Sequence, residues 1–363
     1  MLKGKKIQTV ALIMSMVVGM IIAACLAPAP APVTSEEPAA PVAQTAAKST
    51  LDIVKERGKL ICVGNATLPG FGFLNEAGEF SGFDVDFCKA LAAAIFGDAT
   101  KHEIRAATAS ERFTVLQSGE TDVLIRNTTL TMSRETDLGL NFAPTTFYDG
   151  QGIMVQKASN IKTLQDLDGA SICVQTGTTT ELNLADQMAA AGVSYEPVVF
   201  EKSEEVTTAY EEGRCDAWTT DKSGLVSLQT TLADPSAHEI MDVTLSKEPL
   251  APAVRHGDDQ WYDLVTWVIY ATFTAEEMGI TSANVDSFMT TEDPNVMKLL
   301  GLEGEFCAKI GLDNSCFVNV IKQVGNYGEI YNRNLGPDTI FNLPRGLNAL
   351  YTEGGLLYAP PIR

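Results

Sequence analysis

The sequence predicts an α/β protein built from two doubly wound lobes joined by a two-strand hinge, and two duplicated patterns support this prediction. Residues 119–127 and 213–221 each indicate a helix that ends at glycine, then a tight turn and a short strand finishing in a polar residue. Residues 58–63 and 169–174 share a second pattern, a short apolar strand after a helical segment. Because both patterns occur in the same order, duplication explains them better than chance does.

The N-terminal segment, residues 1–24, has the composition of an export signal. Three lysines precede an uncharged apolar run, and small residues lie directly before Cys25. These small residues resemble a bacterial lipobox, which implies that Cys25 becomes the lipidated first residue of the mature chain. A transmembrane anchor and a signal peptide without lipid are the alternatives. Residues 25–48 are rich in proline and alanine, which predicts an extended linker between the lipid and the folded part.

The charge balance excludes one class of partner. The 363-residue chain has a formal net charge of −20, with 46 acidic and 26 basic residues. Removing the signal takes away three lysines and no acid, which lowers this charge from −20 to −23. Nucleic-acid binding needs a basic face, so we expect no nucleic-acid partner.

Six cysteines follow Cys25, an even number that fits an exported protein in which disulfides persist. Six cysteines allow fifteen connectivities. The favoured one joins neighbouring elements of one α/β unit or one local loop, and its pairs are Cys62–Cys88, Cys173–Cys215 and Cys307–Cys316. Metal binding is the competing interpretation, but the chain has no Cys-x-x-Cys and only three widely spaced histidines, so we expect no zinc site.

The chain from about residue 49 is long enough for two domains with cores of their own. We expect lobe 1 to comprise residues 49–150 and 252–363, including a C-terminal extension of unassigned role, and lobe 2 to comprise residues 151–251. Two strands, near residues 148–152 and 247–254, would cross between the lobes and form a hinge. The second of these segments is also expected to hold the last strand of lobe 2.

Three segments resemble motifs of the polar amino acid-binding proteins of bacterial ABC importers. Residues 82–87 resemble a signature of that family, residues 129–134 its Thr-x-Thr-x-x-Arg segment, and residues 216–221 its amine site in the second lobe. The family branch that takes L-amino acids in general is similar over nearly the whole mature chain, including residues 326–329 and 358–363.

That resemblance implies a type II periplasmic-binding-protein fold and a function. The chain would be an extracytoplasmic monomer, held at the membrane only through its lipid, that captures L-amino acids between its lobes without a cofactor. It would deliver them to permease subunits with an associated ATPase. Which amino acids bind is not predicted by the sequence.

A free amino acid offers a carboxylate and an ammonium, so its receptor needs a guanidinium and a carboxylate. Arg134 is the candidate for the ligand carboxylate, because its planar donors contact two oxygens at once. The alternative is a surface arginine that caps a helix or pairs with Glu135. Asp221 is the candidate for the ammonium, and its alternative role is the N-cap of a helix that begins at Lys222.

A second anion site is expected where a helix begins at residues 176–181. Thr178 and Glu181 have capping-box spacing, so the amides of the first turn, including that of Thr179, would point at the cleft. The alternative is that these threonines only cap the helix. Thr129 belongs to the segment that resembles the family motif. Asn127 would end a strand at the edge of the sheet where ligands bind.

The wall of the pocket is predicted by resemblance. Leu68 and Phe71 lie in a segment similar to the loop with which the family stacks an apolar or aromatic side chain on the ligand. Arg126 and Asn127 differ from the small residues that many members have there, and a polar, roomy pocket would fit broad specificity.

Motifs of catalysis are weak or missing, so we expect a binding protein and no enzyme. The chain has no His-Glu-x-x-His, no Gly-x-Ser-x-Gly and no phosphate-binding loop. Two alternatives stay open on the same fold: a periplasmic amino acid dehydratase, and a sensory protein that docks to a receptor when ligand is bound.

Overall fold

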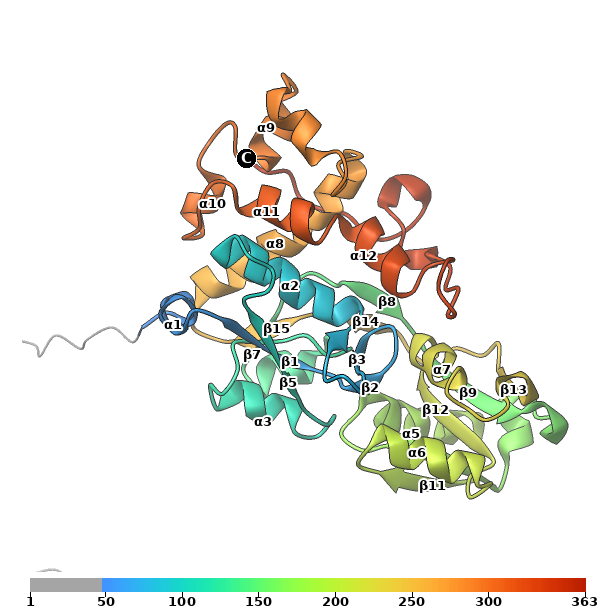
Figure 1. The fold of residues 1–363 in the computed structure, drawn as a ribbon. Helices are drawn as coiled ribbons and strands as arrows, with labels where there is room; N and C mark the ends of the chain where they lie inside the picture. The colour runs from blue at the N-terminus through green and yellow to red at the C-terminus, as the bar shows by residue number, and fades with distance from the viewer. Residues whose placement is uncertain (1–47) are drawn as a thin grey trace, which may run out of the picture. The chain divides into compact units, whose positions relative to one another are not determined.

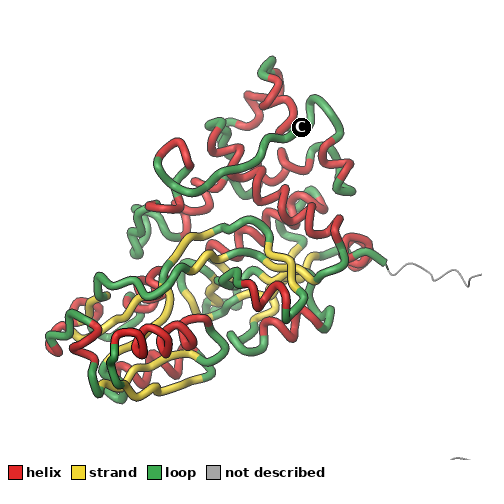
Figure 2. Tube along the Cα trace, turned by 180° about the vertical axis from the view of Figure 1, so that it is seen from behind, coloured by secondary structure: helices red, strands yellow, loops and turns green. Residues whose placement is uncertain are grey.

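Two five-stranded sheets of mixed strand direction form the framework of the protein, of which the computed structural model describes residues 48–363 (Figures 1 and 2). The predictions for residues 1–24, for Cys25 and for the linker up to residue 47 lie outside the described residues. The first sheet has the order β5 (His102–Ala106), β1 (Leu60–Gly64), β6 (Val123–Leu124), β15 (Ala253–Arg255) and β7 (Leu140–Phe142). The second has the order β11 (Tyr195–Phe200), β10 (Ala170–Gln175), β12 (Ala217–Asp221), β9 (Gln151–Gln156) and β13 (His238–Ile240).

The two sheets agree in strand direction. In each sheet the first three strands of the order are parallel, and the fourth runs antiparallel to both of its neighbours. The turn glycines of the duplicated patterns, Gly58, Gly119, Gly169 and Gly213, all have positive φ, as the predicted helix ends require. The prediction of two similar α/β lobes is therefore confirmed.

The hinge consists of two short strands that pair with each other outside both large sheets. Strand β8 (Phe147–Asp149) runs antiparallel to β14 (Glu248–Leu250). The prediction that the last strand of lobe 2 lies near residues 249–254 is wrong. This segment contains the end of β14 and the start of β15, and the last strand of the lobe 2 sheet is β13.

A third sheet, β2 (Thr67–Leu68), β3 (Gly72–Leu74) and β4 (Phe80–Ser81), precedes the first long helix.

Helices flank the sheets and build the C-terminal extension. Those of the lobes are α1 (Thr50–Arg57), α2 (Phe83–Phe96), α3 (Arg112–Gln117), α4 (Met132–Thr136), α5 (Thr179–Ala191), α6 (Ser203–Glu211), α7 (Lys222–Gln229) and α8 (Asp259–Glu277). Those of the extension are α9 (Pro294–Leu299), α10 (Phe306–Lys309), α11 (Cys316–Gln323) and α12 (Tyr327–Asn334). Among residues 48–363, no helix combines the length and the apolar composition that crossing a bilayer requires.

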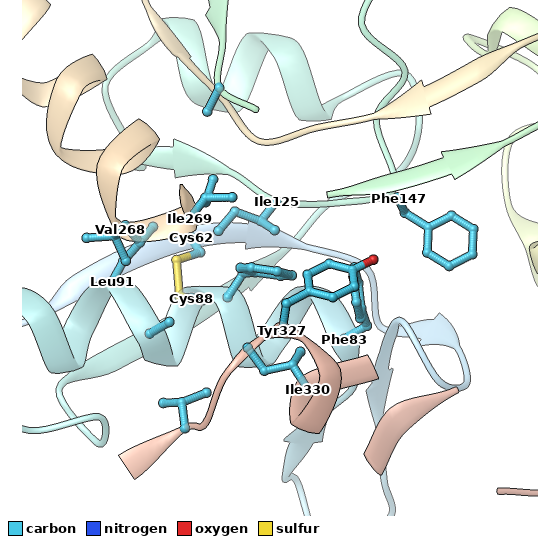
Figure 3. Close-up of a cluster of buried hydrophobic side chains, with 14 of the residues drawn as sticks. Cys62, Phe83, Cys88, Leu91, Ile125, Phe147, Val268, Ile269, Tyr327 and Ile330 are labelled. Carbon is cyan, nitrogen blue, oxygen red and sulfur yellow. A yellow bond between two sulfur atoms is a disulfide. The ribbon is translucent and has the colours of Figure 1, made fainter. Parts of the chain in front are cut away.

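An aromatic cluster attaches the extension to lobe 1 (Figure 3). The ring of Phe83, at the start of α2, lies 5.8 Å from Phe147 of the hinge and 5.7 Å from Tyr327 of α12. The Tyr327 hydroxyl donates a hydrogen bond of 2.8 Å to the carbonyl of Thr146. Edge-to-face aromatic pairs of this kind add about 0.5–1.5 kcal/mol beyond burial. The extension is thus packed on α2 and on the strand that leads into lobe 2.

Three disulfides join the cysteine pairs that the sequence favoured. Cys62–Cys88 links β1 to α2, Cys173–Cys215 links β10 to the turn before β12, and Cys307–Cys316 links α10 to α11. Their Cα atoms lie 6.3, 5.6 and 6.2 Å apart. Each bridge closes within one lobe or within the extension.

Candidate functional site

Arg134 is a buried residue of lobe 1, held in place by the segment before it. The hydroxyl of Thr131 caps α4 and accepts a 3.3 Å hydrogen bond from the Arg134 amide, while Nη1 of Arg134 donates to the carbonyl of Thr129 at 2.7 Å. The guanidinium lies 5.0 Å from the ring centre of Phe113. Its side chain forms no ion pair with Glu135 or any other acid within residues 48–363. The surface-arginine alternative is therefore wrong.

Asp221 ends β12 in lobe 2 and occupies the N-cap position of α7, but its side chain makes no capping hydrogen bond. Another aspartate caps this helix. Asp149 of the hinge accepts hydrogen bonds from the amide of Ser223, at 3.3 Å, and from its hydroxyl. Asp221 therefore holds the N-cap position that the alternative gave it, but its side chain does not bond an amide of the first turn. Its buried carboxylate remains available to a ligand.

Buried charges of both signs gather between the lobes. Burial raises the pKa of Asp221 well above its usual range, and the negative charges of Asp149 and Glu248 raise it further. Arg112 and Arg134 oppose that rise. Burial likewise lowers the pKa of Arg134 to about 10, although Glu248 and Asp221 counteract the shift. A group with a depressed or raised pKa of this kind gains from any ligand that brings the opposite charge.

Glu248 connects the two lobes and was not predicted from the sequence. Its carboxylate accepts hydrogen bonds from the hydroxyl of Thr129 in lobe 1 at 2.5 Å, from the hydroxyl of Thr179 in lobe 2 at 2.8 Å, and from Nδ2 of Asn183 at 2.8 Å. The two threonine hydroxyls lie 3.4 Å apart. Glu248 is 1% exposed. The available signal was an acidic residue in the second predicted crossing segment, residues 247–254.

Thr178 and Thr179 begin α5, as the sequence predicts, and they have separate partners. Thr178 is the N-cap: its hydroxyl accepts from the Glu181 amide at 3.1 Å and donates to the Gln175 carbonyl at 2.7 Å. Glu181 bonds the amide of Gly177 in place of the cap amide, so only half of the expected capping box is formed. The amides of the first turn have no partner inside the helix, which suits an anion.

Asn127 lies just beyond β6, because this strand ends earlier than the sequence predicts. The sequence predicts a strand over residues 123–127, but β6 ends at Leu124 and Asn127 has φ 31°, a left-handed conformation that a strand cannot contain. Its amide donates to the buried carboxylate of Asp84 at 2.8 Å, and its Oδ1 accepts from Asn65 at 3.3 Å. Asn127 is thereby fixed at the sheet edge.

The prediction that Phe71 forms part of the apolar wall of the ligand pocket is wrong. This ring is 1% exposed and lies 5.9 Å from Phe83 and 5.2 Å from Phe147, so the aromatic core of lobe 1 encloses it and no face is left for a ligand. Leu68 is also buried, in β2, which packs against α7 of lobe 2. The neighbouring Pro69 carbonyl accepts a hydrogen bond from the Ser227 hydroxyl of α7 at 2.5 Å. This loop therefore joins the two lobes.

Arg112 is a second buried arginine that the sequence analysis missed. It begins α3 in lobe 1, is 3% exposed, and its Nη2 lies 3.5 Å from the carbonyl of Gly177 in lobe 2. Nearby, the hydroxyl of Ser110 donates to Glu201 of lobe 2 at 3.0 Å. The signal in the sequence was a charged residue at the start of a helix that also carries Phe113, Val115 and Leu116. In residues 48–363, no three His, Cys, Asp or Glu side chains gather as a metal site would require.

The family model of the bacterial extracellular solute-binding proteins, family 3, matches residues 60–282. The chain belongs to this family. The match covers both five-stranded sheets and α8, and it ends before α9.

Relatives of this family-3 protein are similar over nearly its whole length. The general L-amino acid-binding periplasmic protein AapJ of Rhizobium johnstonii is 53% identical over 323 residues, which cover 88% of this chain and 95% of AapJ. The glutamate/glutamine/aspartate/asparagine-binding protein BztA of Rhodobacter capsulatus is 50% identical, over 90% of this chain and 96% of BztA. A match of that length must continue past the end of the family model into the C-terminal extension.

A solved structure agrees with this family-3 fold. A periplasmic binding protein of an ABC transporter from Brucella ovis, with glutathione bound, is 50% identical and superposes with a TM-score of 0.85. The comparison covers 87% of this chain and 100% of the Brucella chain.

Proposed function

We propose that this protein captures L-amino acids between its two lobes outside the cytoplasm and delivers them to the permease of an ABC importer. One observation supports the proposal above all: Arg134 of lobe 1 and Asp221 of lobe 2 are both buried, and neither takes part in an ion pair among the described residues. A buried charge without an ion-pair partner is costly, and a zwitterionic ligand would compensate both. The names of AapJ and BztA support the same class of ligand.

Each residue of the site then has a role. Arg134 binds the α-carboxylate of the ligand, helped by the amides at the start of α5 near Thr178 and Thr179. Asp221 binds the ammonium. Thr129 contributes its hydroxyl from lobe 1, and Asn127 contributes from the edge of the lobe 1 sheet. Since the ligand contacts both lobes, its binding favours the closed arrangement.

The proposed lobe boundaries follow the sheets. Residues 49–150 and 252–363 form lobe 1 with its extension, and residues 151–251 form lobe 2, because β8 and β14 cross together between the two large sheets. Closure about these strands would present a different surface to the permease than the open form does.

Cys25 and the segment before it are proposed to deliver the protein to the outer side of the membrane as a lipoprotein. The variant Cys25→Ser should leave the membrane fraction or accumulate unprocessed. Detection of the Cys25→Ser variant in processed form and still in the membrane fraction would contradict the lipid anchor.

The ligand class is tested by thermal denaturation of the purified protein, freed of ligand, with each of the twenty amino acids. A ligand at a hundredfold excess over its Kd stabilises the protein by about 2.7 kcal/mol. We expect several amino acids to raise the melting temperature, and mass spectrometry to recover them unchanged. Stabilisation by none of them contradicts the proposal, and a chemically altered amino acid would indicate a dehydratase.

A further inference from the structure

Gln151 is a fully buried polar residue at the start of β9, where the chain leaves the hinge and enters lobe 2. Its side-chain nitrogen, Nε2, donates hydrogen bonds to the carbonyl of Thr180 at 2.8 Å and to the hydroxyl of Thr219 at 2.9 Å. Its side-chain oxygen, Oε1, is also buried and has no hydrogen-bond partner in residues 48–363. A buried acceptor without a donor is destabilising, which indicates that a ligand or a buried water supplies one.

The orientation of the Gln151 amide follows from its two partners. The carbonyl of Thr180 can only accept a hydrogen bond, so the amide nitrogen must face it. The hydroxyl of Thr219 donates its own hydrogen to the carbonyl of Gly152 at 2.7 Å, so it accepts from Gln151. Both hydrogens of Nε2 are therefore used. Exchanging the nitrogen and the oxygen of this amide would place two acceptors against each other at Thr180, so Oε1 is the atom that needs a donor.

Asp221, the residue proposed to bind the ligand ammonium, lies directly opposite Gln151. Strands β9 and β12 are antiparallel, and their register pairs Gln151 with Asp221 and Ile153 with Thr219. Side chains of directly opposed residues lie on the same face of a sheet, with Cβ atoms about 4.5–5.5 Å apart. Because Nε2 of Gln151 is bonded to Thr219, two residues before Asp221 in β12, Oε1 on the other fork of the amide is turned away from Thr219. Two acceptors from adjacent strands thus lie close together at the amine site.

We propose that Oε1 of Gln151 accepts a hydrogen bond from the ligand ammonium, beside the carboxylate of Asp221, and makes the site specific for a primary α-ammonium. The inference rests on the proposed function, because it assumes that Asp221 binds the ammonium. A primary ammonium has three N–H donors, so it can bond both acceptors and still have a donor for a third group. A secondary ammonium, as in proline or an N-methyl amino acid, has a carbon in place of one donor. Such a ligand would lose a bond and leave a buried acceptor unpaired.

Calorimetric titration of the purified, ligand-free protein tests this role with L-glutamate and L-alanine, each compared with its N-methyl derivative. We expect each amino acid to bind at least about tenfold more tightly than its N-methyl derivative, since hydrogen bonds to charged groups are the strong ones. Gln151→Met keeps the volume of the side chain and removes the acceptor. This variant should weaken binding of the amino acids about tenfold or more and binding of the N-methyl derivatives less than about threefold.

The control is Gln165→Met, at an exposed position of the same lobe, which should change neither affinity. Gln151→Glu keeps an acceptor at this position, so it should retain the preference for the primary ammonium, also if Gln151→Met proves unstable. Equal affinity of the unaltered protein for the amino acids and their N-methyl derivatives overturns the proposal. An equal loss for both in Gln151→Met overturns it as well, because a residue that only holds α5 through Thr180 would affect both ligands alike. Absence of binding to every amino acid would instead refute the proposed function.

Discussion

Asp149 and Asp221 both lie at the start of α7 but form different hydrogen bonds. Their substitution should therefore affect different properties, stability for Asp149 and ligand binding for Asp221. Asp149 caps the helix through Ser223, whereas Asp221 has no capping bond. Asp221→Ala should weaken amino acid binding by about two to four orders of magnitude, because it leaves the ligand ammonium unpaired. The melting temperature of the ligand-free variant should not fall. Titration calorimetry and a melt of the same sample measure both.

Asp149→Ala is the matched comparison for that experiment. It removes the cap of α7, and we expect a loss of about 1–2 kcal/mol in the free energy of unfolding. A stable Asp149→Ala variant together with a destabilised Asp221→Ala variant would reverse the roles assigned to them.

Ligand binding should release protons. The pKa of Asp221 is raised well above its usual range by burial and by two nearby carboxylates, so the ligand-free carboxyl holds a proton to higher pH than a free aspartate does. A bound ammonium favours the ionised form and lowers that pKa again. Affinity should therefore rise with pH below the ligand-free pKa. Calorimetry in two buffers with different ionisation enthalpies detects the protons, and identical heats in both buffers would contradict the role of Asp221.

Asp84 should make the free energy of unfolding fall as pH rises. An exposed, salt-bridged acid has the opposite effect. Burial raises its pKa from 3.8 to about 7, despite the bond from Asn127 and the charge of Arg126. Because the folded state binds this proton more tightly than the unfolded state, its contribution is fully present below pH 4 and lost as pH rises to about 7. Urea unfolding of the protein and of Asp84→Asn at several pH values should differ in slope by up to about 1.4 kcal/mol per pH unit in that window.

At the scale of elements, Asn348 is a residue through which the C-terminal extension supports the hinge. Asn348 accepts a hydrogen bond from the amide of Tyr148 in β8 at 2.6 Å and donates to the carbonyl of the same residue at 3.2 Å, so it acts like a strand partner on the edge that β14 leaves free. Asn348→Ala should cost about 1–3 kcal/mol of stability, because it leaves buried backbone groups unsatisfied. Asn332→Ala, at an exposed position of α12, should change little in the same denaturant titration.

Elements that repeat in the sequence were predictable, and contacts between distant elements were not. The duplicated glycine turns and the spacing of the cysteines are local patterns, and they predicted both lobes and all three disulfides. Arg112 and Glu248 were missed because their partners, Gly177 and Thr129, lie 65 and 119 residues away. Phe71 was placed on the wrong side of its loop, since an aromatic residue in a loop looks the same in sequence whether it faces a core or a cleft.

For the whole molecule, Glu248 should influence how far the lobes are closed. Its carboxylate bonds residues of both lobes, Thr129 on one side and Thr179 and Asn183 on the other. Of these bonds, the one from Thr129 crosses to lobe 1, so Glu248→Ala removes an interlobe contact worth about 1.5–3 kcal/mol, because the acceptor is charged. We expect a larger radius of gyration without ligand and at least tenfold weaker amino acid binding, measured by small-angle X-ray scattering and calorimetry.

The control for that variant is Glu239→Ala, which removes the partner of the exposed Lys162 within lobe 2. It should leave the radius and the affinity unchanged. An equally compact, fully active Glu248→Ala variant would show that this contact does not hold the lobes together.

The placement of the disulfides determines which parts of the protein are rigid and which can turn. Covalent bridges stiffen lobe 1, lobe 2 and the extension, each from within, while the crossing between the lobes is held by the short β8–β14 ladder and by side chains. Opening of the lobes should therefore break only non-covalent contacts and no disulfide. It could be repeated for every molecule transported without any redox chemistry. We therefore expect a balance between the open and the closed form that a single bound small molecule is able to shift.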